Sequence, residues 1–209
     1  MKREIIRVKY ADSDWNENHL FLGGDPEKRR PIRFYVYVIR TEDRVILVDA
    51  GCETMPGFEM KGFVPSVEAL RREGIDPHSV TDVILTHAHH DHIECVRYFP
   101  QATVHIEQAE LERAMRYIPA DFSVHAFTDA YTLCEGVEIQ KIGGHSPGSC
   151  IVRVAGEGTT YILAGDECYQ RENLTKCIPT GCSVCPEKSL EFVRTYRDGR
   201  YTVLLMHDD

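Results

Sequence analysis

The sequence has no long hydrophobic run. Its longest apolar stretches, such as residues 45–48, are far shorter than the roughly 20 residues that a membrane-spanning helix needs. The first ten residues, MKREIIRVKY, also lack the apolar stretch of a signal peptide. The mean hydropathy of −0.31 agrees with both absences. We therefore expect no membrane association and a cytoplasmic location.

The sequence also lacks an excess of positive charge. It has 24 Lys and Arg against 33 Asp and Glu, which gives a formal charge of −9. The phosphates of nucleic acids and anionic membranes repel a chain of this sign. The expected partner is a small-molecule substrate, and we expect neither nucleic acid nor a membrane as a partner. The sequence leaves open whether the chain forms a homodimer.

Internal repeats and low-complexity segments are absent, which excludes repeat architectures. With 209 residues, of which 43% are hydrophobic, the chain can bury one sizeable core. We expect a single domain over residues 1–209.

A chain of this length needs no disulfide staples, so its eight cysteines are expected to be free thiols. Four of them fall within residues 168–185, and this stretch ends in the motif Cys182-Ser-Val-Cys185. A structural metal or a redox pair in that stretch is the alternative. The cysteines are Cys52, Cys95, Cys134, Cys150, Cys168, Cys177, Cys182 and Cys185.

Strand and helix patterns alternate along the chain, which is typical of an α/β class. Runs of β-branched and aromatic residues predict a hairpin over 33–40 and 43–49, and further strands at 80–86, 102–106, 131–142, 150–155, 159–164 and 201–206. Helical spacing predicts helices at 67–74, with Ser66 as the cap, and at 94–99, 108–117 and 186–199.

The segment His87-Ala88-His89-His90-Asp91-His92 follows the predicted strand 80–86 and holds four of the ten histidines. In extended backbone, residues two apart point the same way, so His87 and His89 can converge on one metal ion. A turn into the next helix would redirect Asp91 and His92 towards a second ion. Imidazole and carboxylate ligands favour zinc, iron or manganese over calcium or magnesium.

Three more candidate ligands follow predicted strands further along the chain: His145 in GGHSPGS, Asp166 in YILAGDECY and His207 in VLLMHDD. Each alone is typical of a turn or a surface residue. Together with the histidine-rich segment they make seven candidate ligands. Their order along the chain favours a metal site over unrelated turn and surface residues.

The chain resembles the metallo-β-lactamase superfamily of metal-dependent hydrolases. The resemblance is carried by the HxHxDH pattern, by the three downstream residues and by the upstream VILVDAG turn at 45–51. It implies an αβ/βα sandwich, a four-layer fold of two mixed β-sheets flanked by helices. It also implies two divalent metal ions, zinc first and iron or manganese as alternatives. By motif position, His87, His89 and His145 hold one ion, Asp91, His92 and His207 hold the other, and Asp166 bridges both.

Within the superfamily the chain is most similar to the N-acyl-homoserine lactonases. These carry a Tyr three residues after the bridging Asp, and this chain has Tyr169 there, within DECYQREN. By that likeness Tyr169 donates to the lactone carbonyl oxygen; a packed aromatic is the alternative. Two positions depart from the lactonase pattern. His90 replaces an apolar residue, and Glu94-Cys95 replaces small residues that are commonly Gly-Gly.

The implied catalytic residues are Asp91 and Tyr169. Two ions that share a water lower its pKa, and the metal-bridging hydroxide then opens a lactone or cleaves a small carboxylic ester. Asp91 would carry the proton to the leaving group, or would serve as a ligand only. Tyr169 would stabilise the oxyanion. The alternatives are a glyoxalase II-like thioesterase or a phosphodiesterase of the same superfamily, and a non-hydrolytic metal or redox protein.

Residues 53–64, ETMPGFEMKGFV, contain Met55, Phe58, Met60 and Phe63 without a helical or strand period. Such a segment is suited to an adaptable apolar lid over the substrate. The alternative is a loop whose side chains cover the core.

Overall fold

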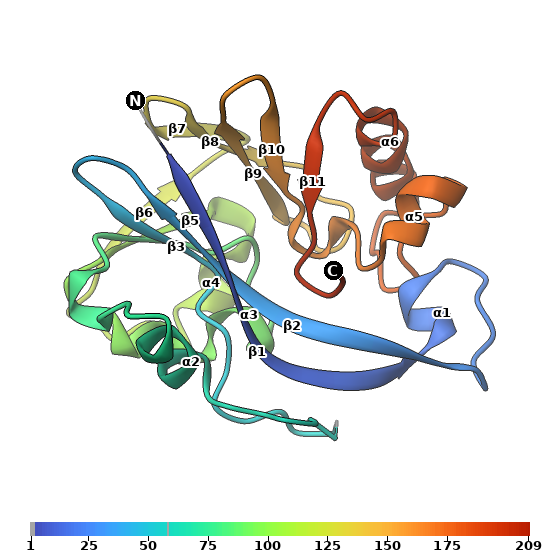
Figure 1. Cartoon of the computed structure of the whole chain (residues 1–209), viewed down its shortest axis with the longest axis horizontal. Helices are drawn as coiled ribbons and strands as arrows, with labels where there is room; N and C mark the ends of the chain where they lie inside the picture. Colours follow the sequence, from blue (N-terminus) through green and yellow to red (C-terminus); the bar gives the residue numbers. More distant parts are fainter. Residues whose placement is uncertain (1–2, 58) are drawn as a thin grey trace. The chain divides into compact units, whose positions relative to one another are not determined.

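The computed structural model describes residues 3–57 and 59–209 (Figure 1). The chain divides into two compact units. The first unit comprises the residues up to Asp12 together with Phe34–Phe127, and the second comprises Ser13–Arg33 and Thr128–Asp209. The expectation of one domain over 1–209 stays a prediction. The predicted lid residue Phe58 lies outside the described residues.

A six-stranded mixed sheet has the order β1-β2-β3-β4-β5-β6. The pair β2–β3 is antiparallel and forms the predicted hairpin, whereas β3, β4, β5 and β6 are parallel neighbours. Strands β3 and β4 are almost entirely buried and apolar, as expected of strands covered on both faces. The strands are β1 (Glu4–Asn16), β2 (Arg29–Arg40), β3 (Val45–Val48), β4 (Asp82–Ile84), β5 (Thr103–Glu107) and β6 (Ser123–Phe127).

The helical segments of the first unit are short. They are α2 (Ser66–Arg72), η1 (Pro77–Ser79), α3 (His90–Ile93), η2 (Glu94–Tyr98), η3 (Gln108–Glu110) and α4 (Leu111–Ala114). The helix predicted at 108–117 is therefore shorter than expected and begins with a 3₁₀ turn. The prediction of Ser66 as a cap was wrong, because its hydroxyl donates to the Ala50 carbonyl (2.6 Å) and Pro65 holds the cap position.

The second sheet has the order β11-β10-β9-β8-β7 and is also mixed, because β10 and β11 are parallel and the other pairs are antiparallel. Its strands are β7 (Ala130–Cys134), β8 (Val137–Lys141), β9 (Cys150–Ala155), β10 (Thr160–Leu163) and β11 (Thr202–Leu204). The single strand predicted at 131–142 is in fact the β7–β8 hairpin. Gly136, with φ of 75°, supplies the left-handed turn residue that allows the reversal.

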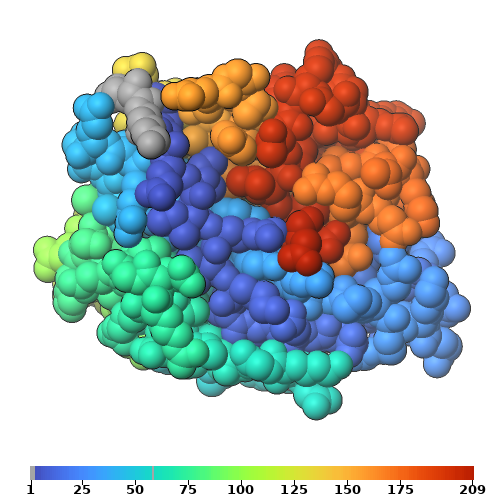
Figure 2. All heavy atoms as spheres, viewed as in Figure 1, coloured from blue at the N-terminus to red at the C-terminus, as the bar shows by residue number. Residues whose placement is uncertain are grey.

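Helices of the second unit are α1 (Glu17–Leu20), α5 (Arg171–Lys176) and α6 (Pro186–Tyr196), with a 3₁₀ turn η4 (Gly165–Glu167). The helices α5 and α6 pack together, in orange and red in Figure 2. The apolar face of α6, with Phe192 and Val193, is buried in a core with Ile151, Ile162 and Leu205. This core supports the loops that follow β10 and β11.

The predicted fold class is confirmed, because the chain forms two mixed sheets accompanied by helices. Sequence patterns missed β1, β6, α1 and α5. Among the described residues, no helix has the length and apolar character needed to cross a membrane.

Candidate metal centre

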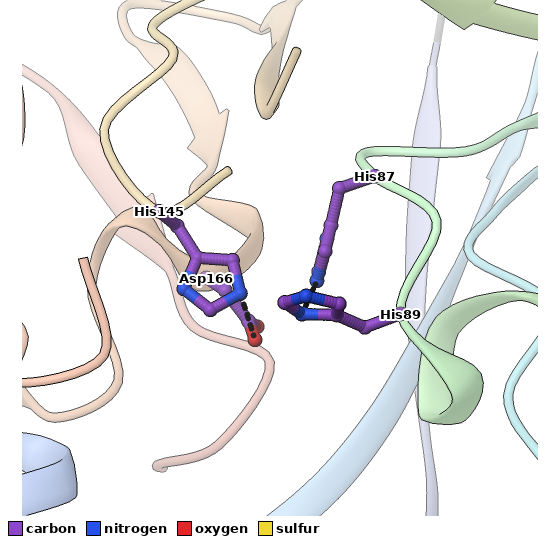
Figure 3. Close-up of side chains that lie close together, drawn as sticks. All are labelled: His87, His89, His145 and Asp166. Atoms are coloured by element: carbon purple, nitrogen blue, oxygen red, sulfur yellow. Dashed lines mark hydrogen bonds and ion pairs between the residues drawn. The ribbon is translucent and has the colours of Figure 1, made fainter. Parts of the chain in front are cut away.

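The loop that follows β4 carries the histidine-rich segment of the first unit. His87 and His89 lie in its extended part, where residues two apart share a direction. His87 Nε2 is 2.9 Å from His89 Nδ1, and the two rings are nearly perpendicular at 83°. Figure 3 shows these nitrogens turned towards each other. The structure therefore brings the two predicted ligands of this pair together.

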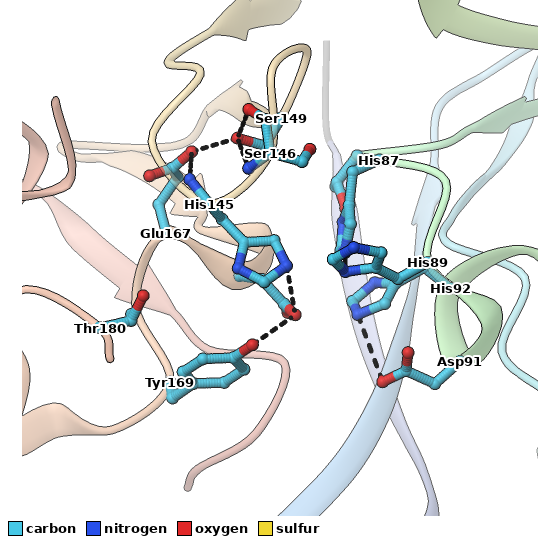
Figure 4. Close-up of polar contacts among 12 residues, drawn as sticks. His87, His89, Asp91, His92, His145, Ser146, Ser149, Glu167, Tyr169 and Thr180 are labelled. Carbon is cyan, nitrogen blue, oxygen red and sulfur yellow. Dashed lines mark hydrogen bonds and ion pairs between the residues drawn. The ribbon is translucent and has the colours of Figure 1, made fainter. Parts of the chain in front are cut away.

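Asp91 and His92 follow in the first turn of α3 and are both buried. The distance from Asp91 Oδ2 to His92 Nε2 is 3.6 Å, drawn as a dashed line in Figure 4. The Tyr10 hydroxyl donates to the Asp91 backbone carbonyl at 3.0 Å and ties β1 to this turn. The predicted change of direction between the two halves of the motif is produced by the start of α3.

Asp49, at the end of β3, orients the histidine-rich segment. One of its carboxylate oxygens accepts from the Thr86 backbone N–H (2.8 Å), and the other accepts from the Thr86 hydroxyl (2.9 Å) and lies 2.8 Å from His92 Nδ1. Because Nδ1 of His92 is held in this way, Nε2 is the atom presented as a ligand. The turn containing Asp49 was visible in the sequence, but the sequence assigned Asp49 no role.

In the second unit, Asp166 lies between two histidines. Its Oδ2 is 3.4 Å from His145 Nε2, and its Oδ1 is 3.1 Å from His207 Nε2. All three side chains are at most 3% exposed. His207 Nδ1 lies 2.9 Å from the Arg33 carbonyl oxygen, which orients Nε2 towards Asp166. Each carboxylate oxygen of Asp166 thus faces a different imidazole.

Tyr169 is buried, with its hydroxyl donating to Asp166 Oδ2 at 3.0 Å. Its ring packs edge-on against Trp15 (centroids 5.6 Å apart) and against His145 (5.9 Å apart), and it is tilted against His207 (5.1 Å apart). The ring is therefore packed, as the alternative interpretation held, while its hydroxyl points at the predicted ligand carboxylate.

Glu167, the residue after Asp166, is fully buried and holds the loop of His145. Its Oε1 accepts from the backbone N–H groups of Gly144 (3.0 Å) and His145 (3.1 Å) and from the Ser149 hydroxyl (2.5 Å), and its Oε2 accepts from the Ser189 hydroxyl (3.0 Å). Burial raises the pKa of the Glu167 carboxyl, although these hydrogen bonds oppose the shift. No pattern in the sequence identified this role.

The donor chemistry of both units fits divalent transition-metal ions. Imidazole nitrogens and carboxylate oxygens lie close together in a largely buried setting, and Nδ1 of His92 and His207 is already held by a protein oxygen. The side chains that each offer a ligand atom are His87, His89, Asp91, His92, His145, Asp166 and His207.

The eight cysteines are free thiols, as expected. Burial raises the pKa of Cys95 to about 12, so this thiol is protonated near neutral pH. Within residues 3–57 and 59–209, no candidate metal-binding group includes a cysteine. A structural metal knot at 168–185 has no support from this arrangement.

A separate buried network lies at the start of β4, away from the histidine-rich segment. Asp82 accepts from Arg44 at 3.0 Å and from the Thr81 hydroxyl at 2.7 Å, and it lies 2.9 Å from His105 Nε2. Burial acts to raise the pKa of Asp82, but the hydrogen bonds outweigh it and lower this pKa below its usual value.

Comparison with known proteins agrees with this chemistry. The model of the metallo-beta-lactamase superfamily matches residues 35–176. The N-acyl homoserine lactonase AiiB of Agrobacterium fabrum is 24% identical over 82% of this chain and 78% of its own length. The N-acyl homoserine lactonase of Bacillus cereus is 26% identical over 69% of this chain and 68% of its own length.

Solved structures share the fold. An N-acyl homoserine lactone hydrolase with the product N-hexanoyl-L-homoserine at its catalytic metal centre has a TM-score of 0.84 and 20% identity, covering 99% of this chain and 93% of that one. The dizinc quorum-quenching lactonase AidC has a TM-score of 0.77 and 15% identity, covering 99% and 87% of the two chains.

The family match and the donor side chains define a metallo-hydrolase. Since the family model covers more than half of its residues, the chain belongs to the metallo-beta-lactamase superfamily. The predictions of this family, of a hydrolase and of the two-sheet fold are confirmed.

Proposed function

We propose that this chain is a dinuclear metal-dependent lactonase that opens a lactone or cleaves a small carboxylic ester. The observation that carries the proposal is the arrangement around Asp166. One carboxylate oxygen faces His145, the other faces His207, and the Tyr169 hydroxyl donates to the same carboxylate. If Asp166 holds the metal ions, the Tyr169 hydroxyl is a hydrogen-bond donor beside them that can serve carbonyl activation.

The proposed ligand sets draw on both units within one hydrolase domain. His87, His89 and His145 would hold one ion, with zinc as the first choice of metal. The second ion would be held by Asp91, His92 and His207, with Asp166 shared by both. This assignment rests on membership of the superfamily and on the order of the residues along the chain.

When bound, two divalent ions supply Lewis acidity and lower the pKa of a water that they share. Asp91 would accept a proton at one carboxylate oxygen and return it to the leaving alkoxide. Tyr169 would turn its one hydroxyl hydrogen bond from Asp166 to the carbonyl oxygen as negative charge develops there. Glu167 would keep the backbone of His145 in place throughout.

The lactonase relatives support the substrate class. The two solved structures described above both hold the product N-hexanoyl-L-homoserine. We therefore propose a small acylated lactone as the substrate of this chain.

Replacement of Tyr169 by Phe tests this function. Loss of one oxyanion donor typically lowers kcat by roughly 100- to 1,000-fold. The variant should retain its metal and its fold and lose rate on lactones and esters. The loss on phosphodiesters should be smaller, because their charge is already spread over several oxygens.

Lactone, thioester and phosphodiester turnover should be compared for both proteins at matched metal content. Turnover of phosphodiesters or thioesters without lactones would favour the alternative hydrolases. Equal losses on all substrates, or none, would return Tyr169 to a packing role.

A further inference from the structure

Glu110 is a buried carboxylate that the proposed mechanism does not use. It is 3% exposed and ends η3, the turn that follows β5. One of its oxygens, Oε2, accepts from the backbone N–H of Ala88 at 3.2 Å. Ala88 stands between His87 and His89 and is fully buried. A carboxylate from another loop of the first unit therefore holds the peptide that joins His87 to Ala88, between two candidate ligands.

The histidine-rich segment lies beyond the end of β4, so its buried N–H groups need acceptors other than the regular hydrogen bonds of the sheet. The N–H of Thr86 donates to Asp49 at 2.8 Å, and the N–H of Ala88 donates to Glu110. A buried N–H is stable only while it has an acceptor. Loss of the Glu110 carboxylate would therefore release the Ala88 peptide from this position.

The fold brings Glu110 to this segment because β4 and β5 are parallel neighbours. The carboxyl ends of parallel strands meet at the same edge of a sheet, so the segment after β4 and the turn η3 after β5 begin at one edge. Glu107, the last residue of β5, accepts from the Ala109 N–H at 2.6 Å and caps η3. This cap closes the turn from which Glu110 reaches Ala88.

A second set of contacts holds the His87 ring. The Thr86 hydroxyl donates its one hydrogen to Asp49, and its oxygen lies 3.1 Å from His87 Nδ1. That oxygen must therefore accept from the Nδ1–H group, which leaves Nε2 as the ligand atom of His87. The ring is thus fixed through Thr86, whereas the backbone that leads from it to His89 is fixed through Glu110.

We propose that Glu110 is a positioning residue that sets the distance and direction between the metal-binding nitrogens of His87 and His89. These atoms, His87 Nε2 and His89 Nδ1, are 2.9 Å apart (Figure 3). Rotation of the peptide between them would turn one nitrogen away from the other, so an ion held by both would lose a ligand. This role of Glu110 rests on the proposed metal site and not on a lactone substrate.

Three substitutions separate the reach of the side chain from its charge. Glu110→Ala removes the acceptor. Glu110→Gln keeps an amide oxygen at the same reach without the charge, and Glu110→Asp keeps the charge but withdraws it by one methylene group. Asp82→Ala is the matched control, because it removes a buried carboxylate of the same sheet whose partners, Arg44 and His105, lie outside the ligand set.

Zinc affinity is measured by competition with a chelator on the zinc-loaded chain. In Glu110→Ala, one of the two ions should bind about 10-fold more weakly, as is usual when a group that positions a metal ligand is lost. Glu110→Asp should approach this loss, whereas Glu110→Gln should stay within about threefold of the wild type. Asp82→Ala should unfold at lower urea concentration and keep the wild-type zinc affinity.

Wild-type zinc affinity in both Glu110→Ala and Glu110→Asp would overturn the proposal. An equal loss of affinity in Asp82→Ala would also overturn it, because any buried carboxylate of the sheet would then have the same effect. If Glu110→Ala does not fold, the other two variants decide. A larger loss in Glu110→Gln than in Glu110→Asp would show that the charge matters and that the contact with Ala88 does not.

Amide hydrogen exchange tests the contact itself on the zinc-loaded chain. The Ala88 N–H should exchange about 10-fold faster in Glu110→Asp than in the wild type, because its acceptor is withdrawn. Equal exchange rates would overturn the hold of Glu110 on this peptide. A zinc-bound wild type that hydrolyses no lactone would overturn the proposed function, while the zinc affinities of the variants would still decide the role of Glu110.

Discussion

The two units present their candidate ligands in different ways. In the first unit, four ligands lie within six residues, and Asp49 reaches the imidazole of His92 directly. In the second unit, His145, Asp166 and His207 follow three separate elements, and Glu167 acts on His145 only through its backbone N–H. Asp49 thus orients a candidate ligand imidazole directly, whereas Glu167 fixes the backbone of the loop that carries His145.

From this contrast we expect the largest loss of metal affinity for Asp49→Asn. The amide keeps an oxygen for Thr86, but its NH₂ group would donate to His92 Nδ1 and move the imidazole proton to Nε2, the ligand atom. Metal affinity should fall by roughly 10- to 100-fold, as is usual when the outer partner of a histidine ligand is lost.

Competition with a chelator measures that affinity. Asp82→Asn is the control, because it makes the same change at a buried Asp that lies 2.9 Å from a histidine outside the ligand set. Equal affinities for Asp49→Asn and the wild type would show that Asp49 does not orient His92.

A smaller loss of metal affinity is expected for substitutions of Glu167 in the second unit. Glu167→Ala removes the acceptor for two backbone N–H groups and two hydroxyls. We expect metal affinity to fall by about 10-fold, which is the lower limit of the range usual when a group that positions a metal ligand is lost. Glu167→Gln keeps a carbonyl oxygen for the three Oε1 donors and should stay within about threefold of the wild type. A loss in the Gln variant as large as in the Ala variant would contradict positioning through the backbone.

Sequence patterns proposed the candidate ligands, which the structure brings close together, but they did not reveal the groups that orient them. The HxHxDH spacing identified His87, His89, Asp91 and His92 because they are adjacent in the chain. Resemblance to a family was needed to select His145, Asp166 and His207 from other polar residues at strand ends.

The orienting groups could not be predicted, because they act through contacts that the fold creates. Glu167 reaches residues up to 23 positions away in the chain. The carbonyl of Arg33 lies 174 positions from His207, and backbone carbonyls carry no sequence signal.

The same limit applies to the fold. Strands with buried apolar runs, such as β3 and β9, were predicted from their composition. Strand β6, with the sequence SVHAF, has mostly half-buried polar and apolar residues and was missed. The strand predicted at 131–142 is divided by a turn at Gly136. The positive φ of this residue depends on the pairing of β7 with β8, which the sequence pattern does not show.

We expect Asp82→Asn to leave metal binding unchanged. The difference in unfolding free energy between the wild type and this variant should depend on pH. The pKa of Asp82 is lowered in the folded chain, so its charged form stabilises the fold above the unfolded pKa of about 3.9. At neutral pH the variant should lose about 2 to 3 kcal/mol of unfolding free energy. The difference from the wild type should shrink as pH falls through the folded pKa.

Urea unfolding of both proteins between neutral and acidic pH measures this difference. A constant difference at all pH values would mean that the Asp82 charge does not contribute. Loss of metal from the variant would mean that the network at the start of β4 is coupled to the ligands.

The metal content of the purified chain tests the central claim most directly. Elemental analysis after gentle purification should give about two transition-metal ions per chain, as expected of a dinuclear hydrolase site. The substitution Asp166→Ala should lower this content more than His89→Ala, because it removes a ligand assigned to both ions. A metal-free chain that still hydrolyses lactones at the full rate, or an Asp166→Ala protein that retains both ions, would contradict the account.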